Sequence, residues 1–479
     1  MKQKVLFLLF VALALNACCK DDKEPTANTE RTETQKWIEE KMRDEYLWYT
    51  EIPAANKLNY QLETENFFTS LLSKKDGKSY TGSDGKSHHS YFSYIEKLKD
   101  DATTRGYINE KDSYGMECLG LNVMNQDSKE YELWGLVCYV LPGSPAQEAG
   151  VERGDWLILR NDKAMSSVSE LMSGAACSFK VVHGLTLSNK GLVYDTEKTI
   201  NIPASRAVVD NPVFLYTTYK TQEGKHVGYL VYNQFQAGIE GSDADTSYDD
   251  KLREISAQFA DVDDFVLDLR YNNGGLLSSA VLLCNMLCPA NAVGKDLGYL
   301  EYNDGHKSVI RPTASQTDIH NLNLSTLYVL TSESTASASE MVINNLRPYM
   351  KVVMIGEQTV GKNVGSVDYT DNTKTWKIHP IVCRITNSEG NGNYSNGLIP
   401  DQTLSEVFEY NDKGNVSEIH PVFPLGDPNE RLFNAALNAI NGQTRAIRPE
   451  AWAPAANNLQ FQVVGSTLIR KATPVILTK

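Results

Sequence analysis

The spacing of hydrophobic residues changes along this chain, and each spacing predicts a different kind of element. Between residues 34 and 70, apolar positions such as Trp37, Ile38 and Met42 recur near helical intervals, which predicts a small helical module. From 112 to 205, short β-rich runs alternate with turns, which predicts a β-rich domain. From 206 onward, strands and helices alternate, a pattern typical of a largely parallel sheet with crossover helices.

The N-terminus has the pattern of a secretory signal. Two lysines precede a short apolar run, 5–15, and Ala17 is followed by Cys18. This order is typical of a signal peptide, and the run is too short for a comfortable membrane span. The site resembles the bacterial lipoprotein box, in which the cysteine is lipidated and becomes the mature N-terminus. Cys18 is therefore the expected lipidation site, with Cys19 or an ordinary signal peptide as alternatives.

The segment after these cysteines, 18–33, is polar and has no aromatic residue, which predicts a flexible tether. Its Lys20-Asp21-Asp22 looks like the acidic export signal of surface lipoproteins in Bacteroidetes-type bacteria, although a plain solvated linker has the same composition. We expect a protein of the cell envelope, anchored by lipid to the outer membrane and facing either the periplasm or the surface.

Charge and cysteine content limit the classes of function. A net charge of −14 disfavours nucleic acid as a partner. No histidine lies at ligand spacing from a cysteine pair, so we expect no metal, and nothing in the chain indicates a cofactor. The cysteines beyond the tether lie in apolar surroundings and are expected to be buried thiols, with one or two disulfides as an alternative: Cys118, Cys138, Cys177, Cys284, Cys288 and Cys383.

A helix signal lies between two predicted strands of the β-rich domain. Pro145 fits the first turn of a short helix and Gly150 fits its end. The stretch around them strongly resembles a PDZ domain of the bacterial protease-associated kind. The upstream stretch 115–123 matches the loop and strand that receive a peptide's C-terminal carboxylate, so Gly120 and Leu121 are the expected peptide-binding positions. A β domain used only for packing is the alternative.

Two predicted strands, 327–331 and 352–355, are each followed by a residue suited to hydrolysis. Ser337 lies in TASASE after the first strand, and Lys362 lies in GEQTVGKNVGS after the second. A serine hydroxyl needs a base within hydrogen-bond reach, and a lysine shielded from water loses its proton more easily. Ser337 would also begin a helix over 337–347, where unpaired N–H groups favour negative charge. The pattern predicts a serine–lysine pair.

Three motifs occur in order behind the PDZ-like stretch: VLDLRYNNGG (266–275), TASASE (335–340) and GEQTVGKNVGS (356–366). Together they resemble the C-terminal processing peptidases, the tail-specific proteases of bacteria and plastids, and the resemblance runs from about residue 35 to about 440. It implies a multi-domain α/β protein whose peptidase core has a mostly parallel, ClpP/crotonase-like sheet. Asp268 and Arg270 resemble the family's strand-end pair, which would hold the di-glycine turn.

The resemblance also implies roles for single residues. Ser337 would be the nucleophile of an endopeptidase, and Lys362 would take its proton and return it to the leaving amine. The oxyanion would be bound by the backbone N–H groups of Ala338 and Gly275, with Gly274 as the alternative to Gly275.

The chain departs from the family pattern at the residue that orients the lysine. Many relatives carry an Asp eleven residues past the nucleophile or a Gln four residues past the lysine, and this chain has Pro348 and Ser366 there. Ser366 is the expected lysine orienter, with Asn344, Asn345 or backbone carbonyls as alternatives. A Ser–His–Asp triad would require the fold to bring one of the scattered histidines to Ser337.

These observations favour a serine endopeptidase of the cell envelope that cleaves C-terminal or unstructured tails presented by the PDZ-like domain. Its expected partners are a protein or peptide substrate and the membrane, and its oligomeric state stays open. A catalytically silent peptide- or ligand-binding lipoprotein on the same scaffold is the alternative, and a glycan-binding surface lipoprotein is a third. The expected organisation is a signal peptide (1–17), a tether (18–33), a helical module (34–105), a PDZ-like domain (106–205), a peptidase core (206–445) and a C-terminal extension (446–479).

Overall fold

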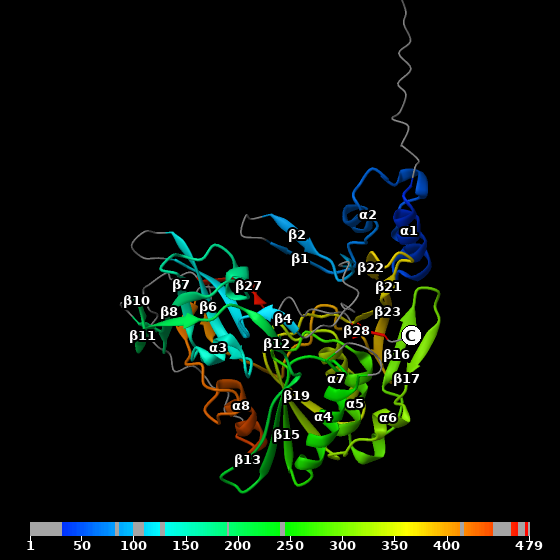
Figure 1. Ribbon diagram of the computed structural model, residues 1–479. Coiled ribbons are helices and arrows are strands. Elements are labelled where there is room, and N and C mark those ends of the chain that lie inside the picture. Colours follow the sequence, from blue (N-terminus) through cyan, green and yellow to red (C-terminus); the bar gives the residue numbers. More distant parts are fainter. Residues whose placement is uncertain are drawn as a thin grey trace, which may run out of the picture.

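The structure is a computed structural model that describes residues 31–81, 86–98, 110–124, 130–188, 191–239, 245–411, 416–443, 461–467 and 475–477. The predicted signal peptide, lipidation site and most of the tether lie outside these residues. Among the helices of the described ranges, none is long and apolar enough to cross a membrane. Figure 1 shows the N-terminal module above the α/β core, with the β-rich domain beside the core.

The N-terminal module contains strands as well as the expected helices. Thr32 caps the first helix by accepting a hydrogen bond from the Gln35 N–H. Strand β3 pairs with β22 of the core, so the module is joined to the core by a sheet. The sequence predicted a mostly helical module, and this was wrong beyond residue 77 because strand pairing across the chain decides the local structure there. The elements are α1 (Glu33–Glu45), α2 (Thr64–Ser70), β1 (Lys78–Thr81), β2 (Ser87–Ser90) and β3 (Tyr94–Lys97), with 3₁₀ turns at Tyr49–Glu51 and Ala55–Lys57.

The β-rich domain is built on one antiparallel sheet, in the order β11-β8-β7-β6-β5-β27. Its short helix begins as predicted, because the Ser144 side chain accepts a hydrogen bond from the Gln147 N–H ahead of Pro145. Gly150 follows with a φ of 79°, a conformation that favours glycine. The elements are β5 (Met116–Met124), β6 (Tyr131–Val140), α3 (Pro145–Glu148), β7 (Trp156–Arg160), a 3₁₀ turn (Val168–Leu171), β8 (Cys177–His183), β9 (Thr186–Ser188), β10 (Gly191–Val193) and β11 (Thr196–Ile202), with β4 (Glu110–Ser113) and β12 (Arg206–Val209) paired beside them.

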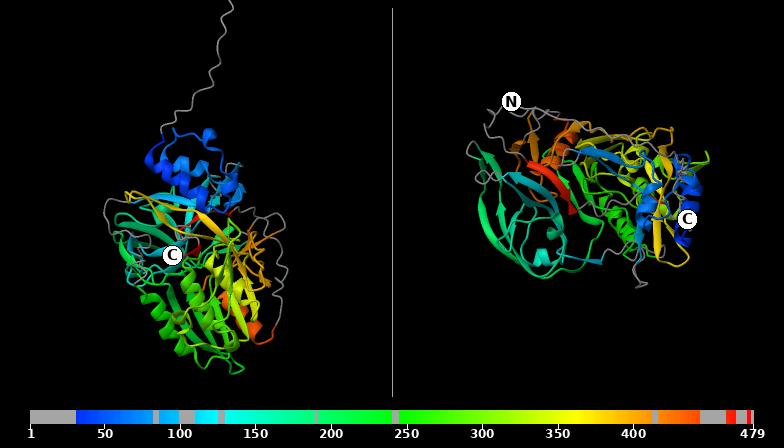
Figure 2. Two further views of the ribbon diagram at one scale, coloured as in Figure 1. Left: turned by 90° about the vertical axis from the view of Figure 1, so that its right-hand side faces the viewer. Right: turned by 90° about the horizontal axis from the view of Figure 1, so that it is seen from above.

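The outermost strand of this sheet comes from the C-terminal end of the chain. The sequence predicted only a C-terminal extension over 446–479, and the structure pairs β27 (Phe461–Ser466) of this extension antiparallel with β5. Seen from above, β27 lies alongside the strands of the β-rich domain (Figure 2).

The α/β core contains a sheet in the order β13-β14-β15-β18-β19-β24. Strands β13 and β14 are antiparallel and the other neighbours are parallel, so the sheet is mostly parallel. Helices α4, α5 and α7 pack in one apolar cluster and α8 in another, on the two sides of the sheet. A ClpP/crotonase-like likeness stays a prediction. The elements are β13 (Val213–Lys220), β14 (His226–Tyr232), α4 (Ser247–Ser256), β15 (Asp264–Asp268), α5 (Leu277–Leu287), β18 (Thr326–Thr331), α7 (Ala338–Leu346), β19 (Lys351–Gly356), β24 (Gln402–Thr403) and α8 (Arg431–Ile440).

A second core sheet runs in the order β17-β16-β23-β20-β28. The sequence predicted one strand over 375–386, but Pro380, which has no N–H to donate, separates β22 from β23. The remaining elements are two 3₁₀ turns (Ala257–Phe259, Ala290–Ala292), β16 (Gly298–Tyr302), β17 (Lys307–Ile310), α6 (Ala314–Thr317), β20 (Val364–Ser366), β21 (Tyr369–Thr370), β22 (Trp376–His379), β23 (Ile381–Asn387), β25 (Phe408–Tyr410), β26 (Val416–Ile419) and β28 (Val475–Ile476).

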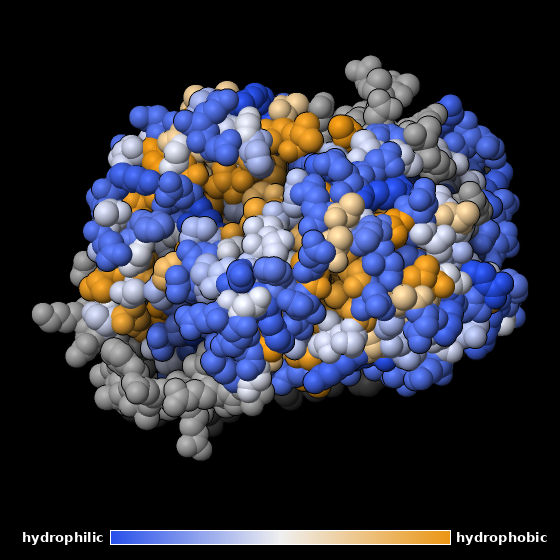
Figure 3. Space-filling view, turned by 90° about the horizontal axis from the view of Figure 1, so that it is seen from below, coloured by the Kyte–Doolittle hydropathy of each residue, from blue (hydrophilic) through white to orange (hydrophobic). Residues whose placement is uncertain are grey.

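The cysteines that the structure describes lie in the interior, and the surface seen in Figure 3 is mainly polar. The six cysteines from Cys118 to Cys383 are buried free thiols, which confirms the prediction of core thiols over disulfides. Viewed from below, the surface is largely hydrophilic and is interrupted by smaller hydrophobic patches (Figure 3).

Candidate active site

Ser337 lies at a strained turn between a strand and a helix. Strand β18 ends at Thr331, and α7 begins at Ala338. Ser337 has φ 61° and ψ −114°, a combination that residues with a side chain rarely adopt, at a cost of roughly 1–3 kcal/mol. Its side chain is fully buried, and its Oγ makes no hydrogen bond to any residue that the structure describes. The turn thus fixes the position of a buried hydroxyl that has no other hydrogen-bond partner among the described residues.

The di-glycine turn after β15 packs directly against Ser337. A Cβ added to Gly274 would lie 2.6 Å from the Ser337 Cβ and 3.1 Å from the Ala338 nitrogen. A Cβ on Gly275 would lie 2.0 Å from the Phe235 carbonyl oxygen. Both glycines have positive φ, 108° and 136°, so only glycine brings the backbone this close to the serine.

Two backbone N–H groups beside Ser337 are available to an oxyanion. Gly274 cannot supply one, because its N–H donates to the Asn272 Oδ1 at 2.8 Å. For the N–H groups of Gly275 and Ala338, the described part of the chain offers no acceptor. Of the two glycines left open by the sequence, the geometry therefore favours Gly275.

Glu340 ties the serine turn to the lysine loop. One carboxylate oxygen, Oε2, accepts the N–H of Ser337 and the N–H of Lys362, each at 2.8 Å. The two backbone nitrogens therefore lie within twice 2.8 Å of each other. The other oxygen accepts the Gly361 N–H at 2.6 Å and the Thr359 hydroxyl at 2.5 Å. The structure thus brings Ser337 and Lys362 into one site.

Lys362 is a buried amine with a perturbed pKa. Its side chain is only 4% exposed, and its Nζ lies 4.9 Å from the centre of the Phe92 ring. Burial lowers the pKa of Lys362 from 10.5 to about 8, against the opposing charges of Asp76 and Glu340. A fraction of the amine is therefore uncharged near neutral pH and able to accept a proton.

Two residues of the N-terminal module, Phe92 and Asp76, form part of the surroundings of the Lys362 amine. Phe92 belongs to the link between β2 and β3, and Asp76 holds that link by accepting the N–H groups of Phe92 at 3.0 Å and Ser93 at 3.1 Å. The Tyr46 hydroxyl from the end of α1 donates to the same carboxylate at 2.9 Å. Burial raises the pKa of Asp76. Helix α1 thus positions the aromatic ring beside the amine.

The residues considered for orienting the lysine do not contact its amine. The Ser366 Oγ, buried in β20, makes no hydrogen bond to any residue within the described ranges, so the expected bond to Lys362 is absent in this arrangement. Asn344 donates its Nδ2 to a backbone carbonyl at 2.8 Å, and Asn345 does so at 3.4 Å. Because β20 pairs with strands on both sides, its backbone rather than a lysine contact fixes the position of Ser366.

The buried His379 is also engaged elsewhere. Its Nδ1 lies 2.6 Å from Asp368 and its Nε2 lies 3.2 Å from Glu96. Since the Ser337 Oγ has no hydrogen-bond partner among the residues described, the structure gives no support to a Ser–His–Asp triad.

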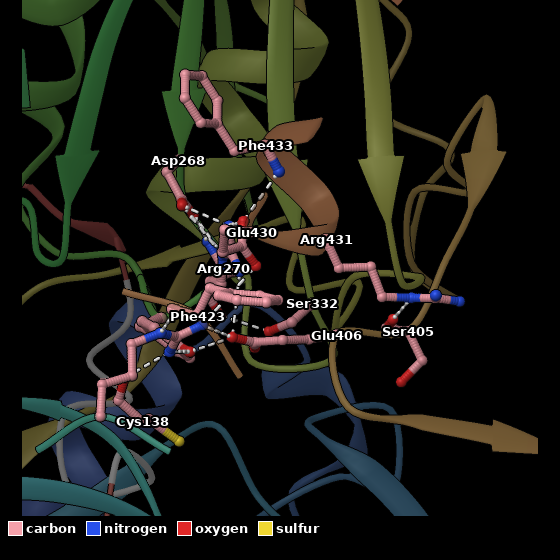
Figure 4. Close-up of polar contacts among 12 residues, drawn as sticks. Cys138, Asp268, Arg270, Ser332, Ser405, Glu406, Phe423, Glu430, Arg431 and Phe433 are labelled. Carbon is pink, nitrogen blue, oxygen red and sulfur yellow. Dashed lines mark hydrogen bonds and ion pairs between the residues drawn. The ribbon is translucent and has the colours of Figure 1, made fainter. Parts of the chain in front are cut away.

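Arg270 is the centre of a buried ion cluster at the end of the strand that precedes the di-glycine turn (Figure 4). It donates to both oxygens of Glu430, at 2.6 and 2.9 Å, and to Asp268 at 3.0 Å. Glu406 lies 3.1 Å from the same guanidinium and also pairs with Arg153 of the β-rich domain. Burial alone would raise the pKa of Glu406, but the charges of Arg153 and Arg270 hold it at about 2.

Arg153 links the β-rich domain to the strand end that precedes the di-glycine turn. It follows α3 in the β-rich domain and donates to the Tyr271 hydroxyl at 2.6 Å and to the Cys138 carbonyl at 2.5 Å. Tyr271 lies directly before Asn272, whose carbonyl accepts the Ala336 N–H of the serine turn at 3.1 Å. A short series of hydrogen bonds therefore connects the β-rich domain to the turn that carries Ser337.

Comparison with known families agrees with this geometry. Residues 226–404 match the model of peptidase family S41, and residues 33–94 match the peptidase S41 N-terminal domain. A solved structure from Bacteroides fragilis, assigned as an S41 protease, is 33% identical, covers 85% of this chain and 98% of its own, and superposes with a TM-score of 0.69. The chain belongs to peptidase family S41.

Curated relatives are carboxyl-terminal-processing proteases. The enzyme of that name from Picosynechococcus is 27% identical over 272 residues, which are 56% of this chain and 61% of the relative. The carboxy-terminal processing protease CtpA of Bacillus subtilis is 25% identical over 304 residues, 63% of this chain and 59% of the relative. The match thus spans less than two thirds of the length of these relatives.

Sequence reasoning named the serine and the lysine but missed three neighbours. Glu340 could have been predicted, because Ser337 and Glu340 form the S-x-x-E spacing of a helix N-terminus. Asp76 and Phe92 gave no local signal, since they come from another module and meet Lys362 only in the folded chain.

Proposed function

We propose that this protein is a serine endopeptidase in which Ser337 and Lys362 form the catalytic dyad. The observation that carries the proposal is the shared Glu340 oxygen, which binds the backbone of both residues beside an amine whose pKa lies at about 8. A serine nucleophile needs a base within hydrogen-bond reach of its hydroxyl. Glu340 holds the two backbones together, and the Ser337 Oγ makes no hydrogen bond within the described residues, so the Lys362 amine must approach it during the reaction.

The residues account for each step of the reaction. The uncharged Lys362 amine takes the Ser337 proton as the Oγ attacks the substrate carbonyl carbon. The N–H groups of Gly275 and Ala338 bind the resulting oxyanion. The C–N bond then breaks as Lys362 returns the proton to the leaving amine. Lys362 next deprotonates a water that attacks the acyl carbon; the bond to the Ser337 Oγ breaks, and Lys362 returns the proton to that oxygen.

We further propose that the substrate is an unstructured or C-terminal polypeptide tail, bound as an added strand on β5 of a PDZ-like domain. Gly120 and Leu121 lie within β5, and strand addition to a sheet edge is an established mode of peptide recognition. We propose that Cys18 carries a lipid that anchors the protein in the outer membrane of the cell envelope, which rests on the sequence pattern alone.

Cleavage of casein tests the dyad. The chain from residue 34 should degrade casein, and Ser337→Ala and Lys362→Ala should each abolish cleavage. Ser334→Ala, a half-buried serine of the same turn, and Lys351→Ala, an exposed lysine on β19, are the matched controls and should stay active. Activity that survives in Ser337→Ala, or a wild type that never cleaves, would leave the silent binding protein as the better interpretation.

The pH profile separates lysine from histidine chemistry. The value of kcat/KM should rise with pH and level off above about 8, where the Lys362 amine is uncharged. A midpoint near 6.5 would point to a histidine instead.

Radiolabelled palmitate tests the anchor. The label should enter the full-length protein in cells and be absent from Cys18→Ser. Label that persists in this variant and disappears in Cys19→Ser would move the anchor by one residue.

A further inference from the structure

The C-terminal segment occupies the edges of two different sheets. In the β-rich domain, the strand order ends β6-β5-β27, so β5 would be the edge without β27. In the core, the order ends β23-β20-β28, so β20 would be the edge without β28. Both covering strands come from the last nineteen residues, 461–479. Figure 1 shows β27 beside the β-rich domain and β28 in the core.

The first contact lies on the predicted peptide-binding strand. Gly120 pairs with Gly465 and Leu121 with Val463 in an antiparallel ladder. The contact continues at Thr467, which is 4% exposed and whose Oγ1 accepts the Cys118 N–H at 2.7 Å. The backbone groups that a bound peptide would use on β5 are therefore already paired.

The second contact lies next to the candidate base. Strand β20 begins two residues past Lys362, at Val364. Ser366 pairs with Ile476 in a parallel ladder, and its carbonyl accepts the Leu477 N–H at 3.1 Å. Leu477 is 8% exposed and belongs to the apolar cluster that also contains Val364. An extended segment with an apolar side chain thus fills this edge.

An exposed strand edge is a template for another extended chain. A tail that belongs to the same chain as both edges competes with free peptides at an effective concentration that reaches ~1 mM for short flexible connections. In this tail-bound arrangement Ser337 has no exposed surface, so a substrate cannot reach its hydroxyl without a rearrangement.

We propose that residues 461–467 and 475–477 are a built-in competitor of the substrate: they fill the β5 edge and the β20 edge, and an extended peptide with an apolar residue must displace them to reach Ser337. The β20 edge is then a second peptide-binding subsite, placed beside the base. This inference rests on the proposed peptidase function for its kinetic consequence, but the occupancy of both edges can be tested without catalysis.

The kinetic test removes the tail by ending the chain at residue 445. With casein-derived peptides, the truncated protein should show a KM lower by ~5-fold or more and a kcat changed by less than about twofold, because only competition is removed. A folded truncated protein whose KM is unchanged or higher overturns the proposal.

The binding test uses Ser337→Ala in both lengths, so it does not depend on cleavage. A fluorescein-labelled peptide with the sequence of residues 461–479 should bind the truncated protein by fluorescence anisotropy and bind the full-length protein at least ~10-fold more weakly, since the tail already fills the site. The same peptide with Leu477→Asp is the matched control and should bind more weakly than the native peptide. Equal binding to both lengths overturns the proposal, whereas competition without any cleavage refutes only the peptidase function.

Full-length Leu477→Asp carries the test if the truncated chain does not fold. A charge at this buried position should detach β28, so the amides of β20 should exchange hydrogen faster than in wild type and KM should fall. Faster exchange with an unchanged KM, or exchange that does not change, contradicts the proposal.

Discussion

Replacing Lys362 with methionine should stabilise the protein in a way that depends on pH. Methionine keeps an unbranched side chain beside the Phe92 ring and removes the ionisable group. Burial lowers the pKa of Lys362 from 10.5 to about 8 in the folded state, while the unfolded chain keeps the ordinary value. Since one pKa unit corresponds to about 1.36 kcal/mol, the folded state is penalised by ~3 kcal/mol at any pH below 8.

The penalty must fade as pH rises. Between pH 8 and 10.5 the unfolded lysine still binds a proton that the folded lysine has lost, so the wild type gains stability relative to Lys362→Met in that window. Urea unfolding of both proteins at pH 7, 9 and 11 measures the difference, and contributions of other groups cancel in it. The variant should be more stable by ~3 kcal/mol at pH 7 and by much less at pH 11. A difference that stays constant over this range would refute the buried, perturbed amine and with it the base of the dyad.

Three further substitutions test the supporting structure. Glu340→Gln should lower the free energy of unfolding by ~1–3 kcal/mol in urea, because an amide cannot accept all the donors that meet this carboxylate; an unchanged midpoint would contradict the shared-carboxylate geometry. Glu430→Gln should cost ~3–5 kcal/mol, because it leaves the buried charge of Arg270 without its two-point partner. For His379, burial opposes the charged form, but the bonds to two carboxylates outweigh burial and raise the pKa of the imidazole. His379→Gln should therefore destabilise the protein below pH 6.5 and progressively less as the pH rises above that value. A loss of stability that does not depend on pH would refute the charged histidine.

Local patterns were sufficient to predict that Ser337 and Lys362 lie in one site. Ser337 and Lys362 each follow a buried strand, and parallel strands place their carboxyl ends at one edge of the sheet. The two loops were therefore expected to lie close together. Glu340 confirms this for their backbones, because it accepts the N–H groups of both residues. The helix expected over 337–347 is present as α7 over 338–346. Orientation of the lysine could not be predicted, because Phe92 and Asp76 are 270 and 286 positions away along the chain and act only through tertiary packing.

The C-terminal segment shows a different limit of sequence reasoning. Residues 461–467 carry no periodic pattern strong enough to predict an element, and a strand of this kind forms only where another sheet offers an open edge. Its partner, β5, is predicted to receive a peptide because the stretch 115–123 resembles the corresponding strand of PDZ domains. That peptide-binding role stays a prediction, and the tertiary structure was needed to find that β27 pairs with this strand.

Glu340 and burial act on Lys362 in opposite directions, and the arrangement needs both. A buried carboxylate beside the lysine favours the charged amine and would by itself hold the proton on it. Three backbone N–H groups and a hydroxyl donate hydrogen bonds to this carboxylate, which therefore holds the two loops together. Burial under Phe92 then decides the protonation, and the pKa falls. Glu340 thus positions the Lys362 loop, and burial beside Phe92 lowers the pKa of the amine, so the lysine is held in place without being kept charged.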